Sequence, residues 1–345
     1  MALVLDHTQS HKIPAMQGAD GLTIGLVNNM PDAAFEATER QFLDLVRGAA
    51  PEGRVRCRLF VAPEVARARK TREALVQRYR NVDELWNAQL DGLIVTGAEP
   101  RAEKLADEPY WPTMTRLVDW ARDNTLSTIW SCLAAHAAVL YADRIERVRL
   151  AAKLSGVFAC ETVAPHPLMA GVVPLGVPHS RYNDLPAAAL STAGYQLLSR
   201  STVAGVDAFA RHEQGGSLFV FIQGHPEYDA DSLLREYRRD IGLYLRGARE
   251  HYPAAPQNYV SRYGGSLLEV FRARAVADRY LDLAQEFPFA AVAAGIDNTW
   301  RRSAQRFYRN WIEQIRQRKN EPMPTSVSLR RRHRDAGLVT AGRRH

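Results

Sequence analysis

Short apolar strand patterns that alternate with helical patterns constrain the fold of this 345-residue chain more than any other feature. Runs rich in β-branched and apolar residues, each bounded by turn formers, occur at 22–29, 54–62, 90–100 and 127–132. Apolar residues at helical spacing follow at 36–48, 112–124 and 133–142. Strands that alternate with helices predict an α/β fold with a doubly wound, mainly parallel sheet.

The second half of the chain adds a strongly apolar strand at 217–224, a helix at 231–249 and a last helix at 300–319. These patterns suggest four parts. We expect a disordered leader (1–20), an α/β domain (21–252), a divergent insertion with a terminal helix packed on the same domain (253–318), and a basic disordered tail (319–345).

The net charge of +7 lies at the C-terminal end of the chain. From Arg316 onward there are nine Lys and Arg residues and two acidic ones, whereas the preceding residues carry 36 of each sign. A basic segment with two prolines and few apolar residues predicts a solvated tail. A nucleic-acid partner is therefore not expected.

Three cysteines, Cys57, Cys132 and Cys160, occur at spacings that match no zinc site, so no metal is predicted. Such a sparse, odd set suits a reducing compartment. The chain lacks an apolar run of about 18 residues and a secretory signal pattern, which predicts a cytoplasmic protein without a membrane partner.

Cys132 is the first candidate for chemistry, because it follows a short apolar strand and opens a helix. A thiol at a helix N-terminus has a lowered pKa and is a better nucleophile. The same turn offers the backbone N–H of Leu133 to an oxyanion. The alternative is that Cys132 is a small buried hydrophobe.

The segment Gly224-His225-Pro226-Glu227 follows another apolar strand. In open parallel sheets ligands bind beyond the carboxyl ends of the strands, where His225 could reach the thiol of Cys132. Glu227, two residues further on, could fix the tautomer of the imidazole. The pattern predicts a nucleophile, a base and an orienting carboxylate.

Several collinear segments resemble one known family, the homoserine O-succinyltransferases of methionine biosynthesis, which are related to class I glutamine amidotransferases. These segments are IGLVNNMP, DGLIVTGAEP, YWP, STIWSC, KLSGVF, PHSRYND, GHPEYDADSLLREYRRD and TWRRSAQRFYRNWI. The likeness runs from about residue 20 to 250 and resumes at 299–312. It implies a glutamine amidotransferase-like (flavodoxin-like) fold with helical additions at the C-terminal end.

The resemblance also implies roles for individual residues. It implies an acyl-thioester on Cys132, a general base at His225 and a supporting carboxylate at Glu227. It places the family's substrate-binding residues on Lys153, Ser180 and Arg239. Acyl-CoA would be a co-substrate, homoserine the acceptor, and no further cofactor is implied.

Three departures from the family bear on specificity. Arg101 falls where the family discriminates between acyl donors, and its charge would suit the free carboxylate of a succinyl group. His136 replaces a glutamine and could be a second proton acceptor, although a core or capping role is the stronger expectation. Residues 253–298 do not resemble the family, and we expect them to border the acceptor pocket or a subunit interface.

Other functions stay open at this point. A glutamine amidotransferase-like cysteine hydrolase would carry the same Cys–His–Glu set, and an acyltransferase could act on serine or a related hydroxy-amino acid. A non-enzymatic scaffold that binds nucleic acid through its tail is disfavoured by the intact set of three residues. The sequence also leaves homodimer formation open.

Overall fold

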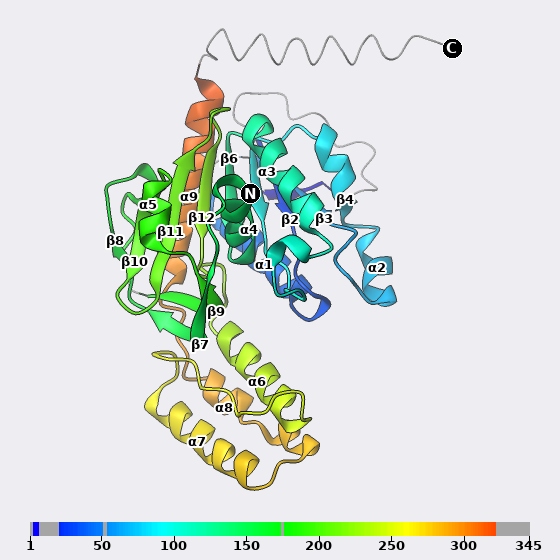
Figure 1. The fold of residues 1–345 in the computed structure, drawn as a ribbon, viewed down its shortest axis with the longest axis vertical. Helices are drawn as coiled ribbons and strands as arrows, with labels where there is room; N and C mark the ends of the chain where they lie inside the picture. The colour runs from blue at the N-terminus through cyan, green and yellow to red at the C-terminus, as the bar shows by residue number, and fades with distance from the viewer. Residues whose placement is uncertain (1–2, 7–20, 51–53, 174–175, 322–345) are drawn as a thin grey trace.

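The computed structural model describes residues 3–6, 21–50, 54–173 and 176–321. Their centre is a ten-stranded sheet in which six neighbouring strands run parallel. In spatial order these are β1 (Leu3–Leu5), β3 (Arg54–Val61), β2 (Gly21–Val27), β5 (Gly92–Val95), β6 (Ser127–Ser131) and β12 (Leu218–Ile222). The predicted mainly parallel sheet is confirmed, and Figure 1 shows it inside the upper body of the molecule.

Antiparallel strands complete the sheet beyond β12. They are β11 (Gly205–His212), β10 (Gln196–Ser201) and β8 (Glu161–Thr162), and the short β4 (Arg80–Asn81) pairs with β3. A separate antiparallel ribbon consists of β7 (Val148–Phe158) and β9 (Val177–Asp184). The sequence patterns did not resolve these strands, whose alternation is weak and whose positions depend on long-range pairing.

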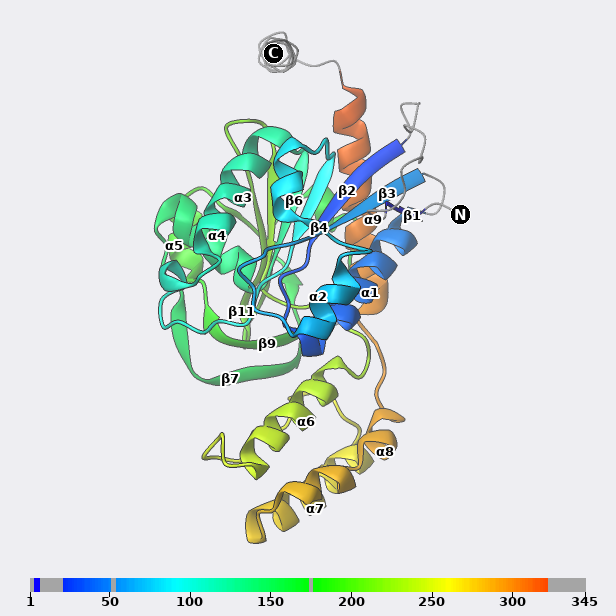
Figure 2. The same cartoon turned by 90° about the vertical axis from the view of Figure 1, so that its right-hand side faces the viewer.

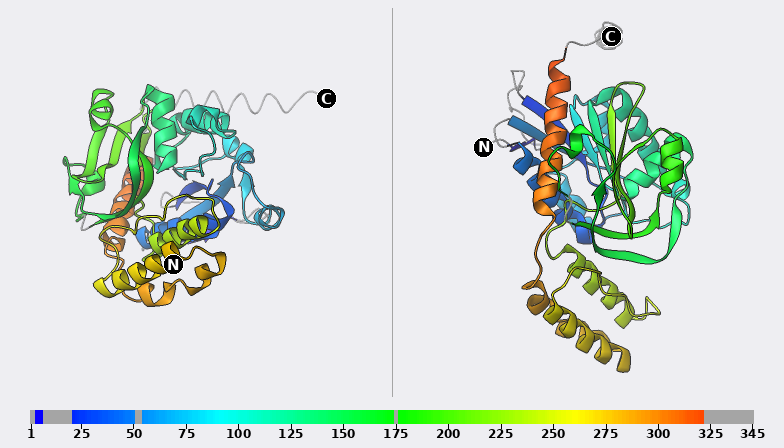
Figure 3. Two further views of the ribbon diagram at one scale, coloured as in Figure 1. Left: turned by 60° about the horizontal axis from the view of Figure 1, so that its bottom comes forward. Right: turned by 90° about the vertical axis from the view of Figure 1, so that its left-hand side faces the viewer.

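Helices cover both faces of the sheet and make three layers. On one face, α1 (Asp32–Ala49) and α9 (Arg301–Asn320) bury their apolar sides against β2 and β3. On the other face lie α3 (Trp111–Asn124), α4 (Leu133–Asp143) and α5 (Ala187–Thr192). Figure 3 shows α9 running along the body. Shorter elements are α2 (Arg69–Leu75) and the 3-10 turns η1 (Val82–Asn87), η2 (Leu105–Asp107) and η3 (Pro167–Met169).

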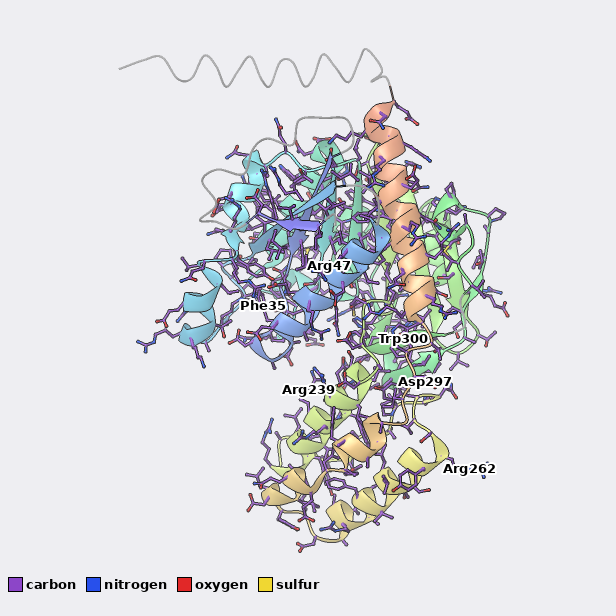
Figure 4. All side chains as sticks on the ribbon, turned by 180° about the vertical axis from the view of Figure 1, so that it is seen from behind. Phe35, Arg47, Arg239, Arg262, Asp297 and Trp300 are labelled. Atoms are coloured by element: carbon purple, nitrogen blue, oxygen red, sulfur yellow. The ribbon has the colours of Figure 1, made fainter. Side chains whose placement is uncertain are left out.

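A helical lobe projects from the α/β body (Figure 2). It contains α6 (Ser232–Leu245), α7 (Arg262–Ala277), the 3-10 turn η4 (Leu281–Glu286) and α8 (Phe289–Ala293). Its buried residues, among them Leu234, Phe271 and Trp300, form a core separate from the two cores of the body. Figure 4 shows Asp297 and Trp300 where the chain leaves the lobe towards α9.

The helical lobe bears on the expected domain boundaries. The expected boundary at 252/253 falls inside the lobe, because buried residues of α6 and of 253–298 share one core. The leader is not wholly without structure, since Leu3–Leu5 pairs with β3. The last helix extends to Asn320, two residues into the expected tail. Residues 7–20 and 322–345, where the rest of the leader and the tail fall, lie outside the described residues.

Within the described ranges, no helix is both long and apolar enough to cross a bilayer.

Candidate active site

Cys132 occupies a strained turn between β6 and α4. Its φ of 51° lies in the left-handed region, which L-residues other than glycine rarely adopt. The turn is fixed by the Cys132 amide, which donates to the carbonyl of Ile222 at 2.7 Å. Such backbone strain persists only where the surroundings enforce it, and it is common at reactive residues. The turn leaves the half-buried thiol at the N-terminus of α4, as predicted.

His225 is brought to Cys132 by the pairing of neighbouring parallel strands. Ile222, the last residue of β12, pairs with Ser131, the last residue of β6. The turn that follows β12 is held by the His225 amide, which donates to the Pro178 carbonyl at 2.7 Å. Because both strands end at the same edge of the sheet, residues 93 positions apart in the sequence meet there.

The three residues expected to form the catalytic set lie together. Nδ1 of His225 is 2.8 Å from Oε1 of Glu227, and His225 also lies close enough to Cys132 to interact electrostatically with its sulfur. The ring of Tyr228 stacks on the imidazole, with centroids 4.2 Å apart. Since Nδ1 is engaged by Glu227, Nε2 is the nitrogen left for the thiol.

The surroundings of His225 favour its charged form. Burial alone would lower the pKa of this imidazole, but the Glu227 carboxylate and the Cys132 sulfur together hold the pKa well above its ordinary value. Glu227 is itself buried, so its charge is little screened by water. A protonated imidazole beside the sulfur would stabilise a thiolate.

The backbone amide of Leu133 is the candidate oxyanion donor. Leu133 is the first residue of α4, and the first N–H groups of a helix have no partner within the helix. Gly97 lies against it: a Cβ at position 97 would come within 2.6 Å of Leu133 Cβ and 3.0 Å of its nitrogen. Only a residue without a side chain at position 97 leaves room beside this amide.

Lys153, Ser180 and Arg239 meet around two acidic residues of α6. Glu236 accepts hydrogen bonds from the Ser180 hydroxyl, from the Tyr228 hydroxyl at 2.5 Å and from Nζ of Lys153 at 3.2 Å. Burial alone would raise the pKa of Glu236, but the lysine and the two hydroxyls hold it below its usual range. Glu236 thus connects the stacked His225–Tyr228 pair to Lys153 and Ser180.

Asp240, one helical turn after Glu236, joins the remaining charges. It accepts from Lys153 at 2.9 Å and from both Nε and a terminal nitrogen of Arg239, at 3.2 and 3.0 Å. Arg249 adds an ion pair at 3.5 Å. Burial would raise the pKa of Asp240, and Lys153 and Arg239 lower it. Figure 4 places Arg239 near the junction of the lobe and the body.

Arg101 lies outside the charged cluster around Glu236 and Asp240. Its side chain is exposed, and within the described ranges its guanidinium makes no hydrogen bond or ion pair. The loop itself is fixed, because the amides of Arg101 and Ala102 donate to the buried carboxylate of Glu108 at 2.6 and 2.8 Å. The predicted role of Arg101 in donor specificity stays a prediction.

The other histidine and cysteines singled out in the sequence lie in the core. Nε2 of His136 is 2.9 Å from the Gln223 side chain, and burial, with Arg181 and Arg147 nearby, lowers its pKa to about 3. This is the expected structural role rather than that of a second base. Cys57 and Cys160 are buried, and burial raises the pKa of Cys57 to about 12.

One buried group resembles a ligand set: atoms of Cys160, His179 and Asp207 lie within 4.8 Å of one another. Nε of Arg181 donates to Nδ1 of His179 at 3.4 Å, which leaves the imidazole proton on Nε2, 3.4 Å from Asp207. A cation would need that nitrogen's lone pair and would lie beside a buried guanidinium, so the donor set does not suit a metal. Asp207 instead accepts from the Ser199 hydroxyl at 2.6 Å, and its backbone carbonyl accepts from the Gln223 amide at 2.7 Å, just before the turn that carries His225.

Sequence reasoning missed Tyr228, Glu236 and Asp240 as site residues. All three stand within the quoted motif that starts at Gly224. The signal was the spacing of four between the two acids, which places both carboxylates on one face of a helix. Tyr228 carried no comparable signal, because its stacking on His225 depends on the turn.

The fold and the site define an α/β protein with a cysteine, a histidine and a glutamate gathered at the carboxyl ends of parallel strands. The family model described as homoserine O-succinyltransferase matches residues 7–321. The chain belongs to the homoserine O-succinyltransferase family, which confirms the resemblance seen in the sequence. The match includes residues 253–298, so the expectation that this segment is foreign to the family is wrong.

Similar curated proteins carry the same name. The homoserine O-succinyltransferase of Rhodopseudomonas palustris is 51% identical, over 84% of this chain and 87% of its own. That of Bradyrhizobium japonicum is 48% identical, over 90% and 98%. A solved glutamine amidotransferase from Thermotoga maritima is 13% identical with a TM-score of 0.45, over 86% of this chain and 98% of its own. A score at this level carries no conclusion about this chain.

Proposed function

We propose that this chain transfers an acyl group from acyl-CoA to the hydroxyl of L-homoserine, with Cys132 as the residue that carries the acyl group. The observation that supports this most is the proximity of Cys132 to the His225–Glu227 pair, beside a cluster of charges suited to an amino acid. Membership of the family supports the same reaction.

In the first half-reaction the Cys132 thiolate attacks the thioester carbonyl of acyl-CoA. The carbonyl oxygen becomes an oxyanion, which the Leu133 amide stabilises. Collapse of the tetrahedral intermediate breaks the carbon–sulfur bond to CoA, and the CoA sulfur leaves with the proton of His225. The acyl group is then a thioester on Cys132, and His225 is neutral.

In the second half-reaction His225 removes the proton of the homoserine hydroxyl while its oxygen attacks the Cys132 thioester. A second oxyanion forms at the Leu133 amide and collapses to expel the Cys132 thiolate. The products are the O-acyl ester and the original pair of thiolate and protonated imidazole. Glu227 would keep Nε2 directed at the reacting atoms throughout by holding Nδ1.

The acceptor cluster suits a zwitterion. Lys153 and Arg239 would bind the carboxylate of the amino acid, while Glu236 and Asp240 would attract its ammonium group. Ser180, which lies on β9, would help to orient the ligand. Serine carries the same charges on a shorter side chain, so comparing homoserine with serine as acceptor tests the length of the pocket.

We propose succinyl-CoA as the preferred donor, on the charge of Arg101 alone. This exposed guanidinium, which has no carboxylate partner among the described residues, could pair with the free carboxylate of a succinyl group. Steady-state rates with succinyl-CoA and acetyl-CoA test this choice. An acetyl-CoA preference that survives Arg101→Gly would refute it.

Intact mass measured after incubation with each acyl-CoA tests the reaction itself. We expect a covalent acyl adduct in the wild type and none in Cys132→Ala, with release of the adduct on adding homoserine. Ammonia released from glutamine, with no adduct from either acyl-CoA, would instead indicate an amidotransferase-like hydrolase. We propose that no metal or prosthetic group takes part, so activity should survive EDTA, and that the enzyme acts in the cytoplasm.

A further inference from the structure

An arginine-lined hollow lies on one face of α6. Its lining residues are Arg235, Arg238, Arg239, Gly242, Arg246 and, from α8, Phe289, and they line a shallow, open depression of about 530 Å³. Helix positions separated by three, four, seven and eleven residues share a face, so these side chains converge by the geometry of α6 alone. Gly242 contributes no side chain at the middle turn, which leaves the floor of the hollow open.

The positive charge of this arginine hollow is only partly neutralised. Arg235 is paired with Asp231 at 2.7 Å, and Arg239 is paired with Asp240 at 3.0 Å. Arg238 lies over the ring of Phe289 at 5.9 Å and has no carboxylate within ion-pair distance among the described residues. Arg246 likewise has none in the described part of the chain. Two guanidinium groups are therefore available to an anion.

The arginine hollow continues outward from the candidate active site. Arg239 belongs to both: it is bonded to Asp240 of the acceptor cluster, and it interacts electrostatically with Glu99. Glu99 stands two residues after Gly97, which packs on Leu133. From Arg239 the helix extends seven residues to Arg246, a rise of about 10 Å. A ligand that is long and anionic at one end could reach from the thiol of Cys132 into the hollow.

We propose that the arginine hollow binds the phosphate groups of the acyl-CoA donor, an inference that rests on the proposed function. CoA carries a diphosphate and a 3′-phosphate at the far end of a pantetheine arm, away from its reactive sulfur. Planar guanidinium groups bind phosphate oxygens in pairs, and Arg238 and Arg246 supply the unpaired ones. The half-buried ring of Phe289 offers an apolar surface to the adenine.

Calorimetric titration of the full-length protein tests the assignment with three probes: CoA, pantetheine and ATP. The variants are Arg238→Gln and Arg246→Gln, with Arg309→Gln, an exposed arginine of α9, as the matched control. We expect each hollow variant to weaken CoA binding about tenfold, the effect of one lost charge-assisted contact. Pantetheine binding should be unchanged in every variant, and Arg309→Gln should match the wild type.

Two results would overturn the inference. One is CoA that binds Arg238→Gln and Arg246→Gln as tightly as the wild type. The other is ATP that binds as tightly as CoA, which would make the hollow a general polyphosphate site. All these side chains are exposed, so unchanged thermal unfolding will show that the variants are folded.

A second assay separates this inference from the proposed function. With homoserine present, Arg246→Gln should raise KM for succinyl-CoA and leave kcat/KM for succinyl-pantetheine unchanged. Acyl transfer with a wild-type KM for succinyl-CoA in Arg238→Gln and Arg246→Gln would refute the assignment of the arginine hollow to CoA and would leave the proposed function standing. CoA binding that depends on these arginines, without any acyl transfer, would refute the proposed function and would leave the assignment of the arginine hollow standing.

Discussion

His225 gains stability in its charged form from two neighbours, Glu227 and Cys132. A histidine whose folded pKa is raised contributes stability that is fully present below its unfolded pKa, about 6.5. That contribution is lost as the pH rises through the folded pKa. The protonation of one residue therefore links the reactivity of the site to the stability of the protein.

Glu227→Gln tests this linkage. We expect the free energy of unfolding to fall most at pH values below about 6.5, with a gap from the wild type that narrows at higher pH. Activity should fall roughly a hundredfold or more, because the base is no longer oriented. Denaturant unfolding at several pH values measures the gap. A gap that is independent of pH would contradict the assigned role.

The backbone at Cys132 leads to a second expectation. Alanine normally gives a more stable protein than glycine by about 0.5–1 kcal/mol in regular structure. At a φ of 51° this order should reverse, with Cys132→Gly more stable than Cys132→Ala by about 1 kcal/mol. Both variants lack the thiol, so the comparison isolates the backbone. Equal or reversed stabilities in thermal unfolding would show that the turn is not strained.

Among the elements, α9 depends on close contact with the sheet. A Cβ at Gly92 of β5 would lie 2.8 Å from Ile315 and 3.2 Å from Trp311. Trp311 also donates from Nε1 to the Ser127 hydroxyl at 2.8 Å. The glycine in β5 lets the helix approach the strands, and without this approach the apolar side of α9 would be exposed.

We expect Gly92→Ala to lower the free energy of unfolding by about 1–3 kcal/mol, since the helix must shift. Gly265→Ala on α7 is the control, because a Cβ there would meet nothing closer than 3.9 Å. That variant should be more stable than the wild type by about 0.4–1 kcal/mol. Chemical denaturation of both proteins gives the two signs, and a loss at position 265 would contradict the reasoning.

The elements that the sequence predicted are those with strong local signals. β2, β6 and β12 are short, largely buried segments bounded by turn formers, and α1 and α6, which follow β2 and β12, have clear apolar faces. The strands β7 and β9, which carry Lys153 and Ser180, have mixed exposure, and their pairing joins segments far apart in the chain. The sequence thus predicted that Cys132 and His225 meet at strand ends and, by resemblance, named Lys153, Ser180 and Arg239, while the acidic residues that join them required the tertiary structure.

At the scale of the whole molecule, the described residues that form the cores of the body and the lobe all precede residue 322. The end of α9 is attached to the body by Lys319, which donates to the Gly21 carbonyl at 2.7 Å and pairs with Asp91 at 2.9 Å. Arg318 donates to the Leu126 carbonyl at 2.6 Å. These contacts attach the last turn of α9 to the body.

Removing residues 322–345 should leave kcat, KM and thermal stability unchanged, because every contact described above is retained. A second truncation, after Arg316, is the control. It removes Arg318 and Lys319, and we expect it to lower the melting temperature. Steady-state assays and thermal unfolding of both proteins measure the difference. Lost activity in the shorter deletion would give the C-terminal segment a role in catalysis.

The position of α6 limits how this protein can be recombined. Glu236, in the second turn of α6, is hydrogen-bonded to Tyr228, whose ring stacks on His225. Tyr237 and Ile241 of the same helix are buried in the core of the lobe. The lobe is therefore not an exchangeable module. A chimaera of two relatives must inherit the segment from the His225 turn to the end of the lobe from one parent, or the new junction will fall inside the acceptor cluster.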